Sequence, residues 1–600
     1  MKDKYQNWLE ECKDRISRMQ QKSRILSWSR LIDFILMAIT FYLGLTTHIT
    51  YIWISAILLV VFIILIIRQQ KAWNLLNYLA NRRKALEDEV TASGHGYPFP
   101  KGEGYSEAGH AFVNDLDIFG ETSLFAMLNR TTSKQGSDKL AQILSNPPQS
   151  PDAIKKRQAA VAELSGKPTW LLDFRVYGMQ KESSADNPDF STSHSSAGPK
   201  NTKEQPTLFL SAFYKVLVIL VPILSLTMIA LLSTGMITIS AFTWYLLLTL
   251  MVPGIFAGKI TKKHTKVSRQ ADSLLSHSKR LQLIEEEKFT AENLLTMQQE
   301  LRTGGISAGK AIKQLSRIIK SMDARLNWLM WIILNFLLLW DIRQMRRFEL
   351  WQKEHSQHTT IWFSVLAEME VLVSKAGFAI CNPGYIYPVC TNEPLQVTAT
   401  NAGHPLINPE KRIDNPIDIK GRGFFNIITG ANMAGKSTYL RTTGINLVMA
   451  MCGMPVCAET FSFYPAQLIT SLHTTDSLSS NKSYFFAELE RLKMIIDRLH
   501  SGEQLYILLD EILKGTNSHD KQQGSKALLQ QLTTLGASGL IATHDLDLGS
   551  LEQAYPQFIR NNSFEAEIID NELFFSYKLQ GGIARNMNAS FLMKQMGITL

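Results

Sequence analysis

A short loop with two glycines, a lysine and a serine is the feature of this 600-residue chain that points most directly to chemistry. The stretch Thr429-Gly430-Ala431-Asn432-Met433-Ala434-Gly435-Lys436-Ser437-Thr438 follows the β-type run Phe424–Ile428 and precedes a helical pattern. Backbone N–H groups of such a loop can surround phosphate oxygens, the lysine can contact the β- and γ-phosphates, and the serine hydroxyl can bind Mg²⁺. The pattern predicts a phosphate-binding loop rather than an ordinary glycine turn.

Two later apolar runs end in side chains that could act on a bound nucleotide. The run Leu505–Leu509 ends in Asp510 and Glu511, and the run Gly539–Thr543 ends in His544. Active groups collect at the carboxyl ends of parallel strands. We expect Asp510 to share Mg²⁺ with the loop serine, Glu511 to take the proton from an attacking water, and His544 to sense the γ-phosphate. A solvated strand end and a structural histidine are the alternatives.

These motifs resemble the ATPase domain of the MutS family, the DNA mismatch-repair clamps. The family's Gly-Pro-Asn-Met-Gly-Gly-Lys-Ser-Thr loop is matched by residues 430–438, with Ala431 for proline and Ala434 for the middle glycine. The family's serine loop, its Asp-Glu-x-x-x-Gly-Thr motif and its Ala-Thr-His motif follow in order. They are matched by Asp476, Ser480, Ser483, Phe485 and Glu488, then by Asp510, Glu511, Gly515 and Thr516, and then by Ala542, Thr543 and His544.

The resemblance implies an α/β P-loop ATPase domain, a parallel sheet with flanking helices, that hydrolyses ATP with Mg²⁺ in a composite homodimer site. It assigns catalysis to Glu511, His544 and Asn432, metal binding to Ser437 and Asp510, and a contact made in trans to Ser483. The remaining nucleotide contacts it implies are Gly430, Ala431, Asn432, Met433, Ala434, Gly435, Lys436, Ser437 and Thr438. The family has an aromatic residue before Asn-Pro, where this chain has Arg412, which could stack on adenine or remain solvated.

Upstream, the resemblance is thinner but extends over roughly three quarters of the chain, with weak patterning between residues 258 and 365. Residues 115–131 with Gly136, Arg157 to Leu164, Leu366–Leu372 and Gly403–Leu406 are similar to the MutS core. The N-terminal domain that detects mismatches with a Phe-x-Glu wedge is expected to be missing, as is a Smr-type nuclease tail. The triplet Phe486-Ala487-Glu488 fits the wedge pattern by chance, and the DNA clamp is expected to be abbreviated or missing.

Four apolar segments have membrane length. A span needs about 20 apolar residues, and residues 31–48, 51–67, 216–233 and 236–257 form two hairpins with short connectors. Lys and Arg flank the hairpins, whereas the connectors carry neither, so the tips are expected outside and all soluble parts in the cytoplasm. We therefore expect a multi-pass protein of the cytoplasmic (inner) membrane, without a cleaved signal peptide.

Composition fits this organisation. The net charge of +9 suits DNA or an anionic membrane face, and the basic stretch from Lys259 to Arg269 suits lipid or DNA. The five cysteines form no Cys-x-x-Cys pair, so we expect reduced thiols and no structural metal. The apolar run Leu326–Trp340 is short and is expected to form a buried core helix, with membrane contact as the alternative.

The predicted domains follow the chain in order. They are a basic N-terminus (1–30), hairpin 1 (31–67), the first part of a helical MutS-like core (68–180), a disordered linker (181–206), hairpin 2 (207–257), a helical lever region (258–400) and the ATPase domain (401–600). The expected function is a membrane-anchored ATPase that binds double-stranded DNA in mismatch repair or recombination, without strong mismatch selectivity. A membrane scaffold or switch without DNA binding is the alternative. An ABC-type transporter is disfavoured because a Leu-Ser-Gly-Gly-Gln signature is absent.

Overall fold

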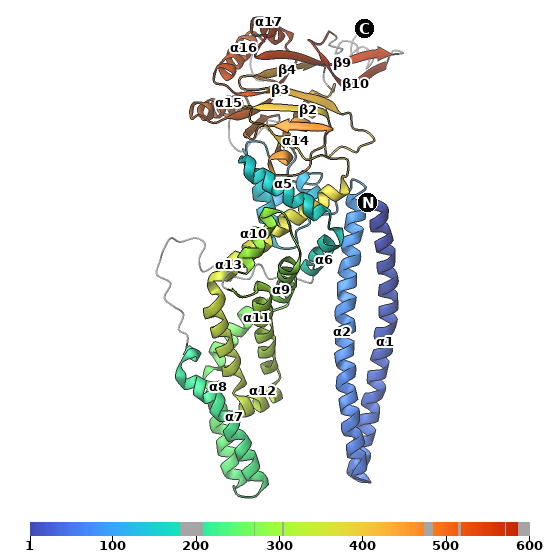
Figure 1. Cartoon of the computed structure of the whole chain (residues 1–600), viewed down its shortest axis with the longest axis vertical. Coiled ribbons are helices and arrows are strands. Elements are labelled where there is room, and N and C mark those ends of the chain that lie inside the picture. The colour runs from blue at the N-terminus through green and yellow to red at the C-terminus, as the bar shows by residue number, and fades with distance from the viewer. Residues whose placement is uncertain are drawn as a thin grey trace.

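The computed structural model describes residues 1–107, 109–179, 208–268, 271–302, 305–431, 433–472, 484–513, 518–569 and 572–585. In this part of the chain the molecule is elongated, with two β-sheets at one end, two helical hairpins at the other and a helical core between them (Figure 1). A mostly helical first part and a mixed α/β C-terminal domain are the architecture that the sequence predicted. The linker expected at residues 181–206 lies outside the described residues.

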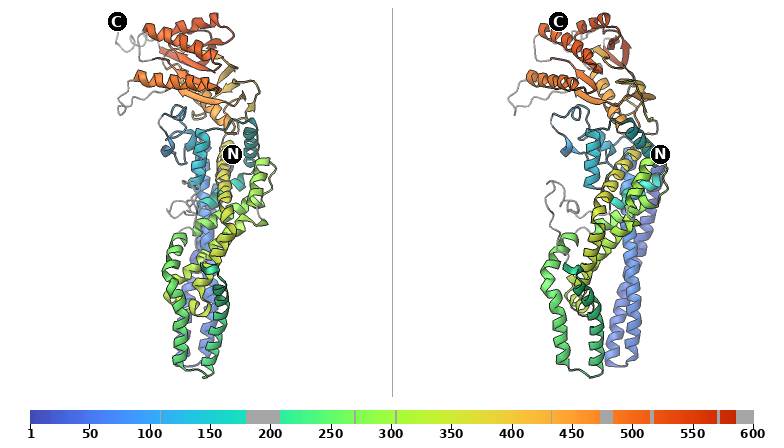
Figure 2. Two further views of the ribbon diagram at one scale, coloured as in Figure 1. Left: turned by 90° about the vertical axis from the view of Figure 1, so that its left-hand side faces the viewer. Right: turned by 60° about the vertical axis from the view of Figure 1, so that its left-hand side comes forward.

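Two pairs of long helices form the end of the molecule opposite the sheets. The pairs are α1 (Lys2–Thr46) with α2 (Thr50–Ala92), and α7 (Ala212–Ser233) with α8 (Ile239–Ser268). Each of the four helices contains a stretch that is long and apolar enough to cross a membrane, and few residues of these stretches are buried inside the protein. Both hairpin tips lie at the same end of the molecule (Figures 1 and 2).

The helical core is organised around the 42-residue helix α13 (Trp340–Cys381), which packs against most other core helices. Buried ion pairs fix its neighbours: Glu370 of α13 binds Arg280 of α9, and Glu89 of α2 binds Arg130 at 2.9 Å. Removing one partner of such a buried pair costs about 3–5 kcal/mol. The other core helices are α3 (Leu124–Leu128), α4 (Lys134–Ser145), α5 (Pro151–Ser165), α6 (Pro168–Gly178), α9 (Ala271–Glu286), α10 (Glu292–Leu301) and α11 (Ala308–Met322).

The short apolar helix of this region differs from the prediction. The run Leu326–Trp340 forms α12 (Trp328–Leu338), and the prediction that it is a buried core helix is wrong. One side of α12 packs against α7, α8 and α13, but Trp328, Leu329, Met330 and Ile333 on the other side are exposed. Within the described part of the chain, helices pack on one side of α12 only, so its apolar composition did not translate into burial.

The C-terminal domain is built on a six-stranded sheet of order β10-β9-β4-β8-β7-β6. Five strands are parallel, and β10 runs antiparallel to β9. Successive residues of β4 face opposite sides: Ile428 packs in the cluster that includes α14, and Ile427 in the cluster that includes α15 and α16. The elements are β4 (Phe425–Gly430), β6 (Gln467–Ser471), β7 (Leu505–Asp510), β8 (Ser538–Thr543), β9 (Ile559–Ile569), β10 (Glu572–Gly581), α14 (Lys436–Met451), α15 (Tyr484–His500), α16 (Ser518–Thr534) and α17 (Leu551–Ala554).

A smaller four-stranded sheet lies between this domain and the core (Figure 1). Its order is β1-β5-β2-β3, and its strands are β1 (Val389–Cys390), β2 (Gln396–Ala402), β3 (Asn415–Lys420) and β5 (Thr460–Phe463). His404 follows β2 and is buried near two arginines, Arg441 and Arg412. Burial and these positive charges lower the pKa of His404 to about 4, so the imidazole is neutral at pH 7 and accepts a hydrogen bond from the N–H of Leu406.

The core holds α14 at both ends. Near its start, Arg441 forms an ion pair of 2.7 Å with Asp117, in the segment that resembles the opening of the MutS core. At its end, the buried Lys375 of α13 donates a hydrogen bond of 2.8 Å to the carbonyl oxygen of Cys452. Burial lowers the pKa of Lys375 to about 8. These two contacts join α14, which begins at the predicted phosphate loop, to the helical core.

Candidate functional site

The predicted phosphate loop connects the buried end of β4 to the first turn of α14. Gly430 has a φ of 152° and Gly435 a φ of 105°, which side-chain-bearing residues rarely adopt. A Cβ atom at Gly430 would also lie 2.5 Å from the carbonyl oxygen of Phe564. Gly435 is the residue before α14, so the loop ends at a helix N-terminus, where backbone N–H groups are available to an anion.

Lys436 is folded back onto its own loop. Its ammonium group donates hydrogen bonds of 2.8 Å to the carbonyl oxygens of Gly430 and Ala431, and the side chain is almost fully buried. The positive charge therefore lies in the middle of the loop, at the carboxyl edge of the sheet. A phosphate group bound in the loop would meet this charge together with the helix N-terminus.

Ser437 and Asp510 meet across two different elements. The hydroxyl of Ser437, in the first turn of α14, donates a hydrogen bond to the carboxylate of Asp510 at the end of β7. A hydroxyl and a carboxylate are both hard oxygen ligands of the kind that Mg²⁺ prefers. The structure therefore brings together the two residues that the sequence assigned to metal binding.

Glu511 and His544 meet beside Lys436. The Glu511 carboxylate lies 2.9 Å from Nε2 of His544, and the same ring nitrogen lies 3.2 Å from the ammonium nitrogen of Lys436. A single imidazole nitrogen can donate to the carboxylate or accept from the ammonium group, but it cannot do both at once. Glu511 has a φ of 56° and donates its N–H to Ala542 of β8, so a left-handed turn directs this side chain toward His544.

Tyr577 of β10 is an aromatic residue beside the loop that sequence reasoning missed. A Cβ atom on Gly435 would lie 3.1 Å from Cδ1 of Tyr577. Tyr577 has a φ of 52° and lies where β10 shifts register against β9, between Phe575 and Leu579. The signal that could have found it is the aromatic cluster 574–577, but no spacing rule connects that cluster with a loop some 140 residues earlier.

Arg412, the predicted adenine contact, is paired rather than solvated. Its Nε atom lies 2.7 Å from a carboxylate oxygen of Asp414, and Nη1 lies 3.5 Å from the hydroxyl of Tyr385. Lys578, the residue after Tyr577, donates a hydrogen bond to the carbonyl oxygen of Asp414. The Arg412 region and Tyr577 are therefore neighbours, although the contact of Arg412 with adenine stays a prediction.

Several predicted site residues lie outside the described part of the chain. They are Asn432, Asp476, Ser480, Ser483, Gly515 and Thr516. Of the remaining loop residues, Met433 and Thr438 are exposed and Ala434 is buried. Glu488 is buried in α15 and accepts a hydrogen bond of 2.6 Å from the N–H of Leu513. The triplet Phe486-Ala487-Glu488 is thus part of the α/β domain, and its carboxylate is occupied internally.

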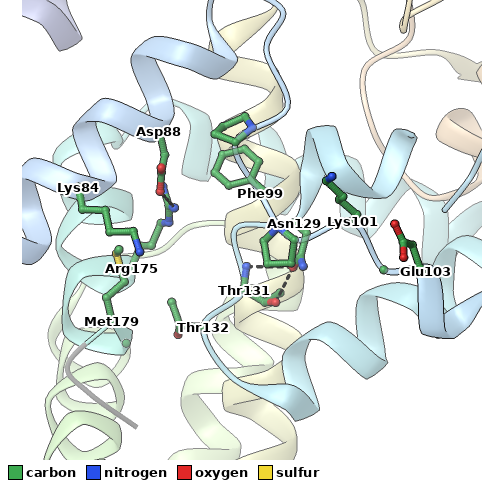
Figure 3. Close-up of a pocket in the computed structure, with 14 residues that line it drawn as sticks. Lys84, Asp88, Phe99, Lys101, Glu103, Asn129, Thr131, Thr132, Arg175 and Met179 are labelled. Atoms are coloured by element: carbon green, nitrogen blue, oxygen red, sulfur yellow. Dashed lines mark hydrogen bonds and ion pairs between the residues drawn. The ribbon is translucent and has the colours of Figure 1, made fainter. Parts of the chain in front are cut away.

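A second cleft, of about 750 Å³, lies in the core between the end of α2, the segment 98–103 and α6 (Figure 3). Three of its charged side chains are paired, since Arg175 binds Asp88 and Lys101 binds Glu121. Of the predicted nucleotide-site residues that the structure describes, none lines it. The edge of the large sheet, and not this cleft, is therefore the candidate functional site.

A mostly parallel sheet with a loop, carboxylates and a histidine at its carboxyl edge defines a doubly wound α/β domain with a ligand site at that edge. The comparison with family models places it more closely. Residues 426–594 match the model of MutS domain V, so this part of the chain is similar to that domain family.

Curated relatives agree. The chain is 30% identical to the DNA mismatch repair protein MutS of Thermotoga sp. (strain RQ2) over 243 residues, which cover 39% of this chain and 29% of the relative. It is 34% identical to the human MutS protein homolog 4 over 195 residues, 31% of this chain and 20% of the relative. It is 30% identical to the MutS protein of Chlorobium chlorochromatii over 226 residues, 36% and 25% of the two chains. The matches thus span less than a third of these relatives.

Proposed function

We propose that this chain is a membrane-anchored MutS-type ATPase that binds and hydrolyses ATP with Mg²⁺ in a homodimer. The observation that carries the proposal is the convergence of Lys436, the Ser437–Asp510 pair and the Glu511–His544 pair at one edge of a parallel sheet. These groups come from the first turn of α14 and from the carboxyl ends of the neighbouring strands β7 and β8, and they supply the charges and metal ligands that phosphoryl transfer uses. The names of the relatives, DNA mismatch repair protein and MutS protein homolog, support a role in repair or recombination.

In the proposed mechanism, Lys436 exchanges the carbonyl oxygens of Gly430 and Ala431 for phosphate oxygens. His544 Nε2, relieved of the ammonium group, then donates to Glu511 or to the γ-phosphate. Glu511 takes the proton of the attacking water onto its carboxylate. Ser437 and Asp510 would hold Mg²⁺, which supplies positive charge against the phosphate oxygens when bound.

Tyr577 is proposed to stack on the adenine. Replacing Tyr577 by alanine should weaken ATP binding by about 1–3 kcal/mol, the range for aromatic–base stacking, or roughly 5- to 150-fold. Binding of inorganic tripolyphosphate should stay unchanged, because the phosphate loop is intact. Competition against a fluorescent ATP analogue measures both ligands.

Two matched variants accompany this measurement. Tyr577→Phe keeps the ring and should keep the affinity, and Phe574→Ala removes another exposed aromatic side chain of the same strand. Equal losses for ATP and tripolyphosphate in Tyr577→Ala would instead indicate a damaged loop and would contradict the stacking role.

Membrane anchoring is proposed from the two hairpins. Exposed tryptophans lie at both ends of the apolar band of the first hairpin, with Trp53 near the tip and Trp28 and Trp73 where the polar halves of α1 and α2 begin. In the second hairpin, the exposed Trp244 lies near the tip. Tryptophan favours the two membrane–water interfaces. The shared direction of the tips lets one bilayer accommodate both hairpins (Figure 1). With Lys and Arg gathered at the other ends, the proposed location is the cytoplasmic membrane, with the α/β domain in the cytoplasm.

DNA binding is proposed to rest on phosphate contacts. The buried Glu488 excludes the Phe486 triplet as a mismatch wedge. Matched and G·T-mismatched duplexes should therefore bind within about 1 kcal/mol of each other, less than a specific base contact provides. Affinity should fall by roughly 0.9 log units per tenfold rise in salt for each neutralised phosphate. Gel-shift titration of the detergent-solubilised protein on paired duplexes at several salt concentrations measures both quantities.

Two other outcomes of this titration have definite meanings. A tenfold preference for the G·T duplex would reveal a mismatch reader and would contradict the prediction. No salt-dependent binding to either duplex would favour the alternative function, a MutS-derived membrane scaffold or switch that hydrolyses ATP without using DNA.

A further inference from the structure

Helix α12 has an outward face made of large apolar side chains. Trp328 is 73% exposed and Ile333 is 40% exposed, with the exposed Leu329 and Met330 between them. The helix begins with a regular cap, because the Asn327 side chain accepts hydrogen bonds from the N–H groups of Leu329 and Met330. A continuous apolar face of this kind on a well-formed helix normally marks a surface that is covered in the working protein.

The opposite face of α12 packs against the second hairpin well inside its apolar stretch. The ring of Phe336 lies 5.6 Å from that of Phe242 and 5.9 Å from that of Tyr245, both in α8. Its carbonyl oxygen accepts a hydrogen bond of 2.8 Å from Ser225 of α7. Ser225 lies eight residues before the end of α7 at Ser233, a distance of about 12 Å along the helix. In a hydrocarbon layer of about 30 Å, Phe336 therefore lies well inside the layer, in the half nearer the hairpin tip.

The beginning of α12 lies at the other boundary of the same stretch. Just before it, Asp323 binds His264 at 2.8 Å, and Arg325 donates to the carbonyl oxygen of Ala257. In α13, Glu349 binds Lys263 at 3.4 Å. These charged groups gather where the apolar run of α8 gives way to lysines, so α12 starts at a charged boundary and extends from it to the depth of Phe336.

The polar groups of the turn after α12 face the protein. Asp341 is buried, accepts a hydrogen bond of 3.0 Å from the indole N–H of Trp331, and donates its own N–H to the side chain of Asn335. Leu339 makes the turn in a left-handed conformation and is fully buried. Non-helical backbone is tolerated at membrane depth only where it is enclosed by protein, and this turn meets that condition.

We propose that α12 is a fifth membrane-embedded segment, a re-entrant helix that enters the bilayer beside the second hairpin and returns through Leu339 into α13 without crossing. Its outward face is covered by lipid acyl chains. The 11 residues of α12 are about 16 Å long, half of what a crossing requires. The inference rests on the proposed membrane anchoring of α7 and α8, whose apolar surface continues directly into that of α12.

The test places the photoreactive residue p-benzoylphenylalanine at Ile333 in the full-length protein, in vesicles of phosphatidylcholine with a quarter phosphatidylglycerol. Two matched positions are labelled in parallel: Leu224, exposed on α7, and Leu295, an exposed apolar side chain of α10 in the core. All three side chains are exposed, so the replacements remove little packing. After illumination, the mass of each protein reports what was captured.

A phospholipid adduct at Ile333 and at Leu224, several-fold above that at Leu295, is the expected result. An adduct at Leu224 with none at Ile333 would overturn the re-entrant helix and leave the anchoring intact. Protein crosslinked to a second copy through Ile333 would show that another chain covers α12, and would likewise overturn the inference. No lipid adduct at either position would instead reject the membrane anchoring itself.

Discussion

Replacing Glu511 by glutamine is expected to lower ATP turnover by a factor of roughly 10²–10⁴ while ATP binding is retained. The amide has the size of the carboxylate and can still accept a hydrogen bond from Nε2 of His544. It cannot take a proton from water, so the loss falls on the chemical step. Binding should persist because Lys436 and the loop backbone are unchanged.

Turnover is measured by phosphate release at saturating ATP, and binding by a fluorescent ATP analogue. Asp545→Asn makes the same chemical change on the neighbouring strand end, where the carboxylate accepts a hydrogen bond from the N–H of Asp547. This control should keep its turnover, because an asparagine oxygen caps the same turn. Turnover of Glu511→Gln equal to that of the control would remove Glu511 from the mechanism.

Replacing Lys436 by alanine is expected to abolish nucleotide binding at ordinary concentrations. Truncating one partner of a buried, hydrogen-bonded charge pair costs about 2–5 kcal/mol, which corresponds to a loss of affinity between about 30-fold and several-thousand-fold. In the complex the nucleotide phosphates would be the other partner of this pair, because the Lys436 side chain is buried at the centre of the loop. Equilibrium binding of the fluorescent analogue measures the loss.

Lys420→Ala serves as the matched variant. Lys420 ends β3 and lies over the ring of Phe424, outside the loop, so its removal should leave affinity unchanged. Thermal unfolding of both variants without nucleotide separates binding from folding, because Lys436 also bonds two loop carbonyl oxygens. Retained affinity in a folded Lys436→Ala protein would contradict a phosphate contact by this side chain.

Local patterns predicted the parts of the site that depend on neighbours in the chain. The glycines, lysine and serine of residues 430–437 lie within one turn between strand and helix, and the structure has that turn. Apolar runs predicted the strands that end at Asp510 and Thr543, because strands buried on both faces must be apolar throughout. The convergence of their ends also followed, since parallel neighbours bring their carboxyl ends to one edge.

Contacts between distant segments could not be predicted in this way. Tyr577 lies beside Gly435 because β10 pairs with β9 and the pairing shifts register near Tyr577. The register of two strands depends on how the whole sheet is paired and packed, which the local sequence does not show. Arg412 was assigned from its position before Asn-Pro, but its partner is Asp414. A hydrogen-bond partner depends on rotamers and packing, which the residue types alone leave open.

The same distinction explains α12. The sequence by itself predicted that the run Leu326–Trp340 forms an apolar helix too short to cross a membrane, and the structure has this helix at Trp328–Leu338. Only the tertiary structure decided that one face of α12 packs against α8 through Phe336 and Phe242, while the apolar side chains of its other face are exposed. The apolar composition of α12 indicates only that burying the helix would be favourable. The positions of α7, α8 and α13 determine which face of α12 is buried in the protein, and the other face is left for the lipid proposed to cover it.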